Sequence, residues 1–502
     1  MSKIVKLDSF KYTAEKDTNI DDVIDTSILS KEQFLAFDRY KKGENIFLTG
    51  PGGTGKTKLI QYFVQHSLIQ GSKFQVCAMT GCASILLNCS ARTLHSWSGI
   101  KLARGTKEEV IENVLRNKTA VKNWKKCKIL ILDEISMLSK KLFEIIEEIP
   151  RIIKKIDEPF GGMQIIFSGD FCQLPPIGTS GEKDTYTFCF QSTKWHSVFP
   201  MYNHILLKKI FRQDDVEYSR ILQNLRKGII TISDYSIIQQ RLSLKYDPSK
   251  HNDCVPTKLF PLRTQADYVN NRMFSEIKEI ENVFTVLEKY DNVTYENGKT
   301  IPDKIIEAGK QLTNKEKEFE IKQLVANSPC VQILRLKKGA AVMCIVNLDM
   351  DNNICNGSQG IVLDIDNDNE NSVPFILVKF SNGIIKKIYP HNWQSEDYPT
   401  MSISQYPLCL AWALTIHKIQ GATLDLAEID VGNGIFEYGQ TYVALSRLKS
   451  LNGLYLSAFN PEKVQTNPKV KEFYDIIEKK SYQAFLEKEV EIENKDIKKV
   501  SL

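Results

Sequence analysis

The sequence predicts an α/β fold built on parallel sheets, and three observations lead to that prediction. A glycine-rich loop joins an apolar strand to a helix within residues 45–70. Short apolar strands (45–49, 74–79, 128–132, 164–168) then alternate with helices (56–69, 139–156) up to about residue 200, as in a parallel sheet covered by helices. A second α/β pattern begins near residue 201, breaks at a β-rich stretch over 331–400, and resumes at 409–431.

The composition allows several domains and sets few limits on partners. The chain has 502 residues, 42% apolar and 25% charged, enough for roughly three ordinary globular domains. A formal charge of +5 neither requires nor excludes nucleic acid, because a basic groove can lie within a nearly neutral total. Eleven cysteines without a C-x-x-C pair are typical of reduced core thiols and argue against a zinc or iron–sulfur site.

The N-terminal stretch and the hydropathy argue against export or membrane insertion. Several acidic residues precede residue 23, unlike a signal or transit peptide, and no apolar run reaches membrane-spanning length. We therefore expect an intracellular protein in the nucleus or cytoplasm, including a viral replication site. We expect no secretion, no membrane partner and no clear targeting signal.

Composition shifts predict the domain boundaries. Residues 1–28 are expected to be a flexible lead-in, and residues 29–200 a first α/β lobe with a small insert near 95–125. Residues 201–280 and 401–465 form a second lobe, with a strand near 204–208, helices near 214–227, 264–279 and 438–449, and strands near 258–261 and 453–457. Residues 281–400 are an insert, solvated up to 330 and then composed of short β-runs. The tail 466–502 is expected to be helical, with a packing stripe of Phe473, Ile476, Ile477 and Phe485.

The glycine-rich loop matches the phosphate-binding pattern G-x-x-x-x-G-K-[ST]. It comprises Gly50, Pro51, Gly52, Gly53, Thr54, Gly55, Lys56 and Thr57. Glycines let successive N–H groups point at one oxyanion, and the dipole of the following helix favours the same charge. Lys56 is placed to neutralise the β- and γ-phosphates, and Thr57 to hold Mg²⁺.

Acidic and amide side chains follow two later strands. Asp133 and Glu134 end a buried strand, where Asp133 suits a water-mediated Mg²⁺ contact and Glu134 suits polarising the attacking water. Gln173 lies in a tight turn after the strand at 164–168, where its amide could reach a γ-phosphate and a water. Each feature alone is weak, because a solvated turn would look the same.

Two arginines of the predicted second lobe complete the candidate site. Arg212 and Arg447 could each reach across a cleft to the γ-phosphate and make hydrolysis depend on closure, although an isolated arginine more often forms a surface salt bridge. A guanine-specific site is excluded because no Asn-Lys-x-Asp motif occurs.

In chain order, these stretches resemble the PIF (petite integration frequency) family of superfamily 1B DNA helicases, relatives of the RecD-like enzymes. The most specific stretch runs from Glu134-Ile-Ser-Met-Leu to Pro159-Phe-Gly-Gly-Met-Gln-Ile-Ile-Phe-Ser-Gly-Asp-Phe-Cys-Gln-Leu-Pro-Pro176. Further matches lie at 80–99, 337–343, 356–360, 417–421 and 439–447, and the similarity covers about residues 29–460.

The resemblance implies two RecA-like P-loop lobes with ATP and Mg²⁺ between them, a wedge insert near 95–125 and an SH3-like β-barrel insert within 281–400. Gln33 matches the glutamine that reads adenine, although Ser30 and Gln33 also fit a simple capping box. Gly421 is implied at the nucleotide. The implied ATPase set is Lys56, Thr57, Asp133, Glu134, Gln173, Arg212 and Arg447.

The resemblance also implies a single-stranded DNA path across both lobes, travelled 5′→3′. The implied contacts are Thr80, Gly81, His95, Trp97, Thr415, His417 and Lys418. Trp97 and Cys172 stand where the family usually has phenylalanine, and Ile419 where it usually has serine. Trp97 is expected to keep a stacking face, whereas Ile419 cannot make a polar DNA contact.

The predicted function is that of a monomeric ATP-dependent DNA helicase in replication, repair, recombination or telomere maintenance. Its expected partners are single-stranded and forked or tailed duplex DNA, with G-quadruplexes and RNA–DNA hybrids as further substrates. Two alternatives stay open: a DNA-stimulated translocase or nucleoprotein remodeller without strand separation, and a non-enzymatic nucleic-acid-binding factor with a relic nucleotide site. The intact catalytic set argues against the second.

Overall fold

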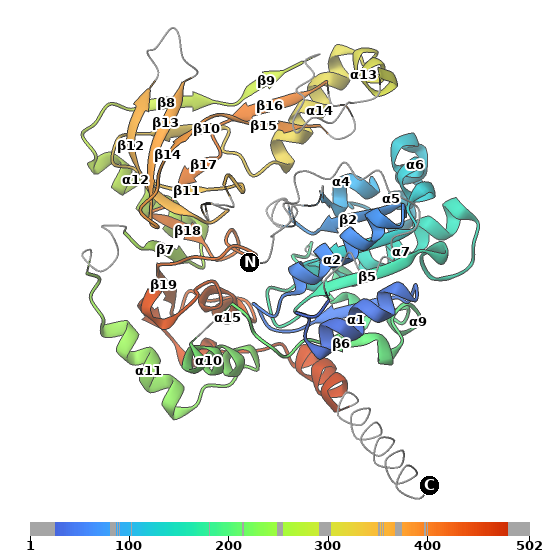
Figure 1. The fold of residues 1–502 in the computed structure, drawn as a ribbon, viewed down its shortest axis with the longest axis horizontal. Helices are drawn as coiled ribbons and strands as arrows, with labels where there is room; N and C mark the ends of the chain where they lie inside the picture. Colours follow the sequence, from blue (N-terminus) through green and yellow to red (C-terminus); the bar gives the residue numbers. More distant parts are fainter. Residues whose placement is uncertain are drawn as a thin grey trace, which may run out of the picture.

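The computed structural model describes residues 26–479, with gaps at 81–86, 88, 90, 102, 180, 213–214, 248–254, 291–302, 350–351, 353, 355, 367–373, 396–397 and 399. Nearly all of the predicted lead-in, as well as Gly81 and Phe485, therefore lies outside the described residues. Two α/β lobes sit side by side, and a β-rich insert extends from the second lobe (Figure 1).

The first lobe is a six-stranded parallel sheet in the order β3-β2-β4-β5-β1-β6. Its strands are β1 (Ile46–Thr49), β2 (Phe74–Ala78), β3 (Arg92–Thr93), β4 (Ile129–Asp133), β5 (Gln164–Gly169) and β6 (His204–Leu206). Its longer helices are α1 (Lys31–Lys41), α2 (Lys56–Ile69) and α7 (Lys140–Lys154), with short helices α8 (Lys183–Tyr186) and α9 (Trp195–Val198). The central strands β1 and β4 are fully buried, as continuous apolar runs predict.

The boundary predicted at residue 200 is wrong. The strand near 204–208 was assigned to the second lobe, but β6 pairs in parallel with β1 and extends the first sheet. Hydrophobic periodicity identifies a strand but does not tell which sheet edge it joins.

The insert near 95–125 forms three helices that pack on the first lobe. They are α4 (Leu94–Ser98), α5 (Lys107–Arg116) and α6 (Lys118–Lys126). Both α5 and α6 contact α7, and the side chains of Trp97, Val114 and Trp124 are buried in the same core as the sheet.

The second lobe is a four-stranded parallel sheet in the order β18-β7-β19-β20. Its strands are β7 (Thr257–Phe260), β18 (Ala413–Thr415), β19 (Ala427–Val431) and β20 (Leu454–Phe459). Its helices are α10 (Val216–Arg226), α11 (Ile232–Ser243), α12 (Arg263–Glu276) and α15 (Gln440–Leu445). Helix α11 was not predicted, because only Asp234 and Ile238 of it are buried and its apolar stripe is weak.

The insert is mainly antiparallel and longer than predicted. One sheet has the order β14-β13-β12-β11-β17, another β15-β16-β9, and β8 pairs with β10. The strands are β8 (Asn282–Thr285), β9 (Leu287–Lys289), β10 (Ile333–Leu336), β11 (Ala341–Cys344), β12 (Gln359–Asp366), β13 (Phe375–Phe380), β14 (Ile385–Ile388), β15 (His391–Gln394), β16 (Ser402–Gln405) and β17 (Leu408–Leu410). The predicted end at residue 400 is wrong, because β16 and β17 pair with insert strands. Within the stretch predicted to be only solvated lie α13 (Asp303–Lys310) and α14 (Asn314–Asn327).

A helix over 468–479 returns the chain to the first lobe, below β6 in Figure 1. Its buried stripe is Val470, Phe473, Tyr474 and Ile477, and the Phe473 ring stacks on that of Phe190 with centroids 4.2 Å apart. The prediction that Ile476 belongs to this stripe is wrong, since a spacing of three and four residues from Val470 places it on the opposite, exposed face.

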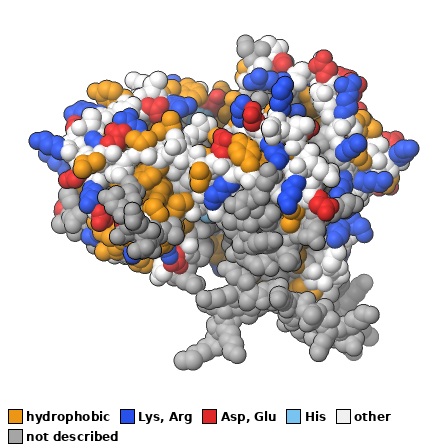
Figure 2. Space-filling model, turned by 90° about the horizontal axis from the view of Figure 1, so that it is seen from above, with side chains coloured by type: hydrophobic (Ala, Val, Ile, Leu, Met, Phe, Trp, Pro, Cys, Tyr) orange, Lys and Arg blue, Asp and Glu red, His pale blue; other side chains and the backbone are white. Residues whose placement is uncertain are grey.

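The described cysteines are free, and no described helix is long and apolar enough to cross a membrane. Lysine and arginine side chains are interspersed with acidic ones on the face seen in Figure 2.

Candidate nucleotide site between the lobes

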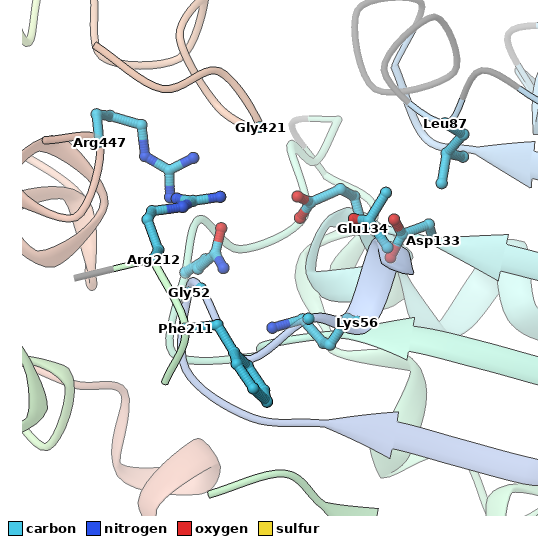
Figure 3. A pocket seen from close by; sticks show the side chains of 13 residues that line it. Gly52, Lys56, Leu87, Asp133, Glu134, Phe211, Arg212, Gly421 and Arg447 are labelled. Atoms are coloured by element: carbon cyan, nitrogen blue, oxygen red, sulfur yellow. The ribbon is translucent and has the colours of Figure 1, made fainter. Parts of the chain in front are cut away.

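A cavity of about 360 Å³ lies between the lobes and collects most of the predicted site (Figure 3). It is lined by Gly52, Gly53, Gly55, Lys56, Thr57, Leu87, Asp133, Glu134, Gln173, Phe211, Arg212, Gly421 and Arg447. Leu87 and Phe211 were not predicted. An aromatic residue directly before Arg212 was visible in the sequence, but nothing marked it as a ligand contact.

The phosphate loop has the backbone that its glycines permit. Gly55 has φ of +80°, and a Cβ there would lie 2.7 Å from Nε2 of Gln33, so a larger residue would clash. Lys56 opens α2, and its Nζ donates hydrogen bonds to the carbonyls of Gly50 (2.6 Å) and Pro51 (2.9 Å). Burial lowers the pKa of Lys56, and the surrounding carboxylates act against that shift. This loop suits a polyphosphate.

Two carboxylates face the loop from the end of β4. Asp133 is the last residue of β4, and Glu134 follows in the left-handed region with φ of +55°. Burial, together with the charge of Glu134, raises the pKa of Asp133 to about 6. A cation nearby would favour the ionised form. Thr57 and Asp133 line the same cavity and offer the hard oxygen ligands that Mg²⁺ prefers, so the residues present fit that ion.

Gln173 brings an unsatisfied amide to the cavity. Its side chain is buried, and its Oε1 has no hydrogen-bond partner within the described part of the chain. A buried polar atom without a partner is costly, so this oxygen is suited to a polar ligand or water.

The second lobe supplies two guanidinium groups, that of Arg447 buried and that of Arg212 half-buried. Arg447 donates from Nε to the carbonyl of Val443 (3.0 Å) and from Nη2 to Oγ of Ser446 (2.8 Å), and Nη1 of Arg212 donates to the carbonyl of Ser446 (3.4 Å). Burial and then the charge of Arg447 lower the pKa of Arg212 to about 10. Burial also lowers the pKa of Arg447. Neither forms an ion pair with a described residue, so both are suited to an anionic ligand.

Two glutamine side chains, those of Gln420 and Gln33, form hydrogen bonds next to the cavity. Gln420 precedes Gly421, and its Nε2 lies 3.5 Å from Oε2 of Glu134, so this contact links the two lobes. Gln420 was not predicted as a site residue. Gln33 forms the predicted capping box with Ser30, and its Nε2 donates to the carbonyl of Thr54 (3.2 Å). Gln33 is not among the lining residues, so its adenine contact stays a prediction.

Comparison with known proteins assigns the family. A model described as PIF1-like helicase matches residues 28–236, and one described as the 2B domain of DNA helicase Pif1 matches residues 320–365. The chain is 33% identical over 470 residues to the ATP-dependent DNA helicase PIF1 of Xenopus laevis, covering 92% of this chain and 67% of that protein. The crystal structure of Pif1 helicase from Candida albicans is similar, with a TM-score of 0.69 and 33% identity over 90% of this chain and 99% of that one. This chain belongs to the PIF1-like helicase family.

A Pif1 helicase from Bacteroides, solved in complex with ADP-AlF3 and single-stranded DNA, is 27% identical with a TM-score of 0.59, over 91% of this chain and 98% of that one. The chain spans about two thirds of the frog and zebrafish PIF1 proteins, 67% and 64% of their lengths.

Within this PIF1-like fold, the ring of one predicted DNA contact is covered. Trp97 is 3% exposed and packs against Trp124 with ring centroids 4.5 Å apart, so its expected stacking face is covered. The substituted positions Cys172 and Ile419 are likewise buried, and Ile419 belongs to the hydrophobic core.

The other predicted DNA contacts differ in accessibility. Thr80 and His95 are half-buried in the first lobe, and burial lowers the pKa of His95. Thr415 is buried, His417 is half-buried with its ring parallel to that of Phe436, and Lys418 is exposed.

Proposed function

We propose that this chain is an ATP-dependent DNA helicase that moves 5′→3′ along single-stranded DNA and separates duplex DNA. One observation carries the proposal: the buried Arg447 and the half-buried Arg212, neither ion-paired with a described residue, line the cavity between the lobes together with the phosphate loop. Such an arrangement makes hydrolysis depend on the relative position of the lobes.

In the proposed mechanism, the phosphate loop and Lys56 bind the phosphates, and Glu134 orients and polarises the attacking water. Arg212 and Arg447 stabilise charge on the transferring phosphoryl group, and Gln173 links that group to the water. Bound Mg²⁺, held through Thr57 and Asp133, would neutralise phosphate charge. Opening and closing of the lobes then moves the enzyme along one strand.

The proposal extends to partners and domains. The proposed substrates are single-stranded DNA and forked or tailed duplex DNA, with G-quadruplexes and RNA–DNA hybrids as further candidates. We propose that the enzyme works as a monomer. The solved complex of the Bacteroides Pif1 helicase with single-stranded DNA supports single-stranded DNA as a ligand. The 2B family match within the insert supports an SH3-like domain there, and α4–α6 correspond to the proposed wedge.

The second candidate is a translocase or nucleoprotein remodeller without strand separation. The site geometry favours it equally, because hydrolysis and movement use the same cavity. Only strand separation itself distinguishes the two functions.

The test is strand separation with ATP on two partial duplexes, one with a 5′ single-stranded tail and one with a 3′ tail. Lys56→Ala serves as the blank. Unwinding only from the 5′ tail is expected. Unwinding only from the 3′ tail would reject the direction, and DNA-stimulated ATP hydrolysis without unwinding of either duplex would favour the translocase.

A further inference from the structure

A buried polar cluster joins the two lobes directly behind the phosphate loop. We call it the Asp170 cluster; it consists of Asp170 of the first lobe, Arg226 and Tyr442 of the second lobe, and Tyr474 of the helix over 468–479. All four side chains are nearly inaccessible to water. None of them was predicted as a site residue, because Asp170 looks like an ordinary turn residue after β5.

The carboxylate of Asp170 accepts hydrogen bonds from three side chains and from the backbone N–H of Cys172 (3.2 Å). Arg226 donates from Nε to Oδ2 (2.9 Å) and from Nη2 to Oδ1 (2.8 Å), a bidentate pair. The hydroxyls of Tyr442 and Tyr474 donate to Oδ2 (3.3 Å) and Oδ1 (3.2 Å). Burial disfavours the ionised carboxylate, but the charge and hydrogen bonds of Arg226 outweigh it and hold the pKa of Asp170 below its ordinary value.

Tyr442 also touches the phosphate loop. Its hydroxyl oxygen accepts the backbone N–H of Gly52 at 3.0 Å, while its proton points to Asp170. Gly52 lines the nucleotide cavity, and a Cβ placed there would lie 4.0 Å from Nη1 of Arg212. One hydroxyl of α15 therefore holds the loop and the carboxylate together.

The helix that carries Tyr442 also sets the position of Arg447. Nε of Arg447 donates to the carbonyl of Val443, and its Nη2 donates to Oγ of Ser446, which caps α15. The guanidinium is thus attached to the end of α15, and α15 is attached to the phosphate loop through Tyr442. A shift of α15 relative to Gly52 moves Arg447 relative to the bound phosphates.

We propose that Tyr442, held by the Asp170 cluster, is a positioning residue for ATP hydrolysis that fixes the distance between the phosphate loop and Arg447. The inference rests on the proposed ATPase function. Because Tyr442 acts through Arg447, which serves the transition state, its loss lowers kcat and leaves KM for ATP nearly unchanged.

The purely structural alternative is that the cluster only stabilises the lobe interface. Replacing Asp170 or Arg226 would leave an uncompensated buried charge and could unfold the chain, so neither is a suitable test. Tyr442→Phe removes only the hydroxyl and keeps the buried ring.

Tyr218→Phe is the matched control. The Tyr218 hydroxyl is also fully buried and donates to α15, at the carbonyl of Leu445 (2.6 Å), but it forms no hydrogen bond with the described residues of the first lobe. Tyr218→Phe therefore loses one buried hydrogen bond to α15, whereas Tyr442→Phe loses two hydrogen bonds to the first lobe, those with Asp170 and Gly52.

The experiment measures kcat and KM for ATP with saturating single-stranded DNA, together with the thermal midpoint, in wild type, Tyr442→Phe, Tyr474→Phe and Tyr218→Phe. We expect kcat to fall about tenfold in Tyr442→Phe, because the hydrogen bonds of the hydroxyl with Asp170 and Gly52 are lost, and KM to change less than about twofold. Tyr474→Phe, which keeps the Gly52 contact, should fall about threefold. Tyr218→Phe should lose thermal stability without losing kcat.

Three results would overturn the inference: unchanged kcat in Tyr442→Phe, an equal loss in Tyr218→Phe, or a rise in KM without a fall in kcat. If Tyr442→Phe is not recovered folded, Tyr474→Phe decides, since a positioning role requires its kcat to fall more than that of Tyr218→Phe. An inactive wild type would reject the proposed function instead, so the two failures are distinct.

Discussion

The two lobes contribute to the nucleotide site in different ways. The first lobe places its groups at the ends of buried parallel strands, where the loop after β1, Asp133 after β4 and Gln173 after β5 converge. The second lobe contributes Arg212 from the segment between β6 and α10, and Arg447 from just beyond α15. Their guanidinium groups donate to a backbone carbonyl or a hydroxyl of their own lobe.

This difference separates binding from hydrolysis. In the proposed mechanism the first lobe binds the phosphates, because its groups follow the strands of one sheet. The second lobe holds two cations that form no ion pair with the residues that the structure describes and that line the cavity opposite the phosphate loop. Changes in the phosphate loop of the first lobe should therefore remove ATP binding, whereas changes in the two arginines should remove turnover alone.

Lys56→Ala should have the largest effect. It removes the cation of the phosphate loop, and we expect ATP hydrolysis to fall by about 10³-fold or more together with ATP affinity. Steady-state hydrolysis and equilibrium binding of ATP measure both. Lys58→Ala, an exposed lysine of the same helix α2, is the control and should behave like wild type. Retained turnover in Lys56→Ala would reject the phosphate-loop assignment.

Glu134→Gln should reduce hydrolysis by about 10²–10³-fold while ATP still binds, since the amide keeps the shape of the side chain but cannot polarise water. Single-turnover hydrolysis measures the loss of the chemical step, and equilibrium binding measures the retained ATP affinity. Wild-type turnover in this variant would show that another group activates the water.

Gln33→Ala tests a first-lobe contact outside the cavity. Its amide supports the carbonyl of Thr54, so we expect KM for ATP to rise about threefold to tenfold with a small change in kcat. A selective loss of discrimination between ATP and GTP would indicate that Gln33 also reads the base. An unchanged KM would limit Gln33 to its capping role.

The smallest effects concern DNA. Lys418→Ala, at an exposed second-lobe cation, should weaken single-stranded DNA binding a few-fold and reduce the salt slope by about 0.7. Trp97→Phe should change DNA affinity less than about twofold, because the ring is buried against Trp124. Titrations of both variants with single-stranded DNA at several salt concentrations measure these affinities. A large loss of DNA affinity in Trp97→Phe would indicate that Trp97 stacks on a base.

Much of this arrangement could be predicted from the sequence, because the first-lobe groups follow buried strands and a glycine-rich loop. The carboxyl ends of parallel strands meet at one edge, so Lys56, Asp133 and Gln173 had to converge. Periodicity could not assign β6 to the first sheet, and it could not show that Trp97 faces the core. The Asp170 cluster was also invisible, since its members come from four separate segments of the chain and only packing brings them together.

ATP affinity and DNA-stimulated turnover of Arg447→Ala test the separation of binding from hydrolysis most directly. The expected result is an affinity within about threefold of wild type and a DNA-stimulated rate about 10³-fold lower, as for loss of an arginine supplied across an interface. Arg241→Ala, a second-lobe arginine on α11 that does not line the cavity, should keep wild-type values. Normal turnover in Arg447→Ala, or a parallel loss of ATP affinity, would contradict the account.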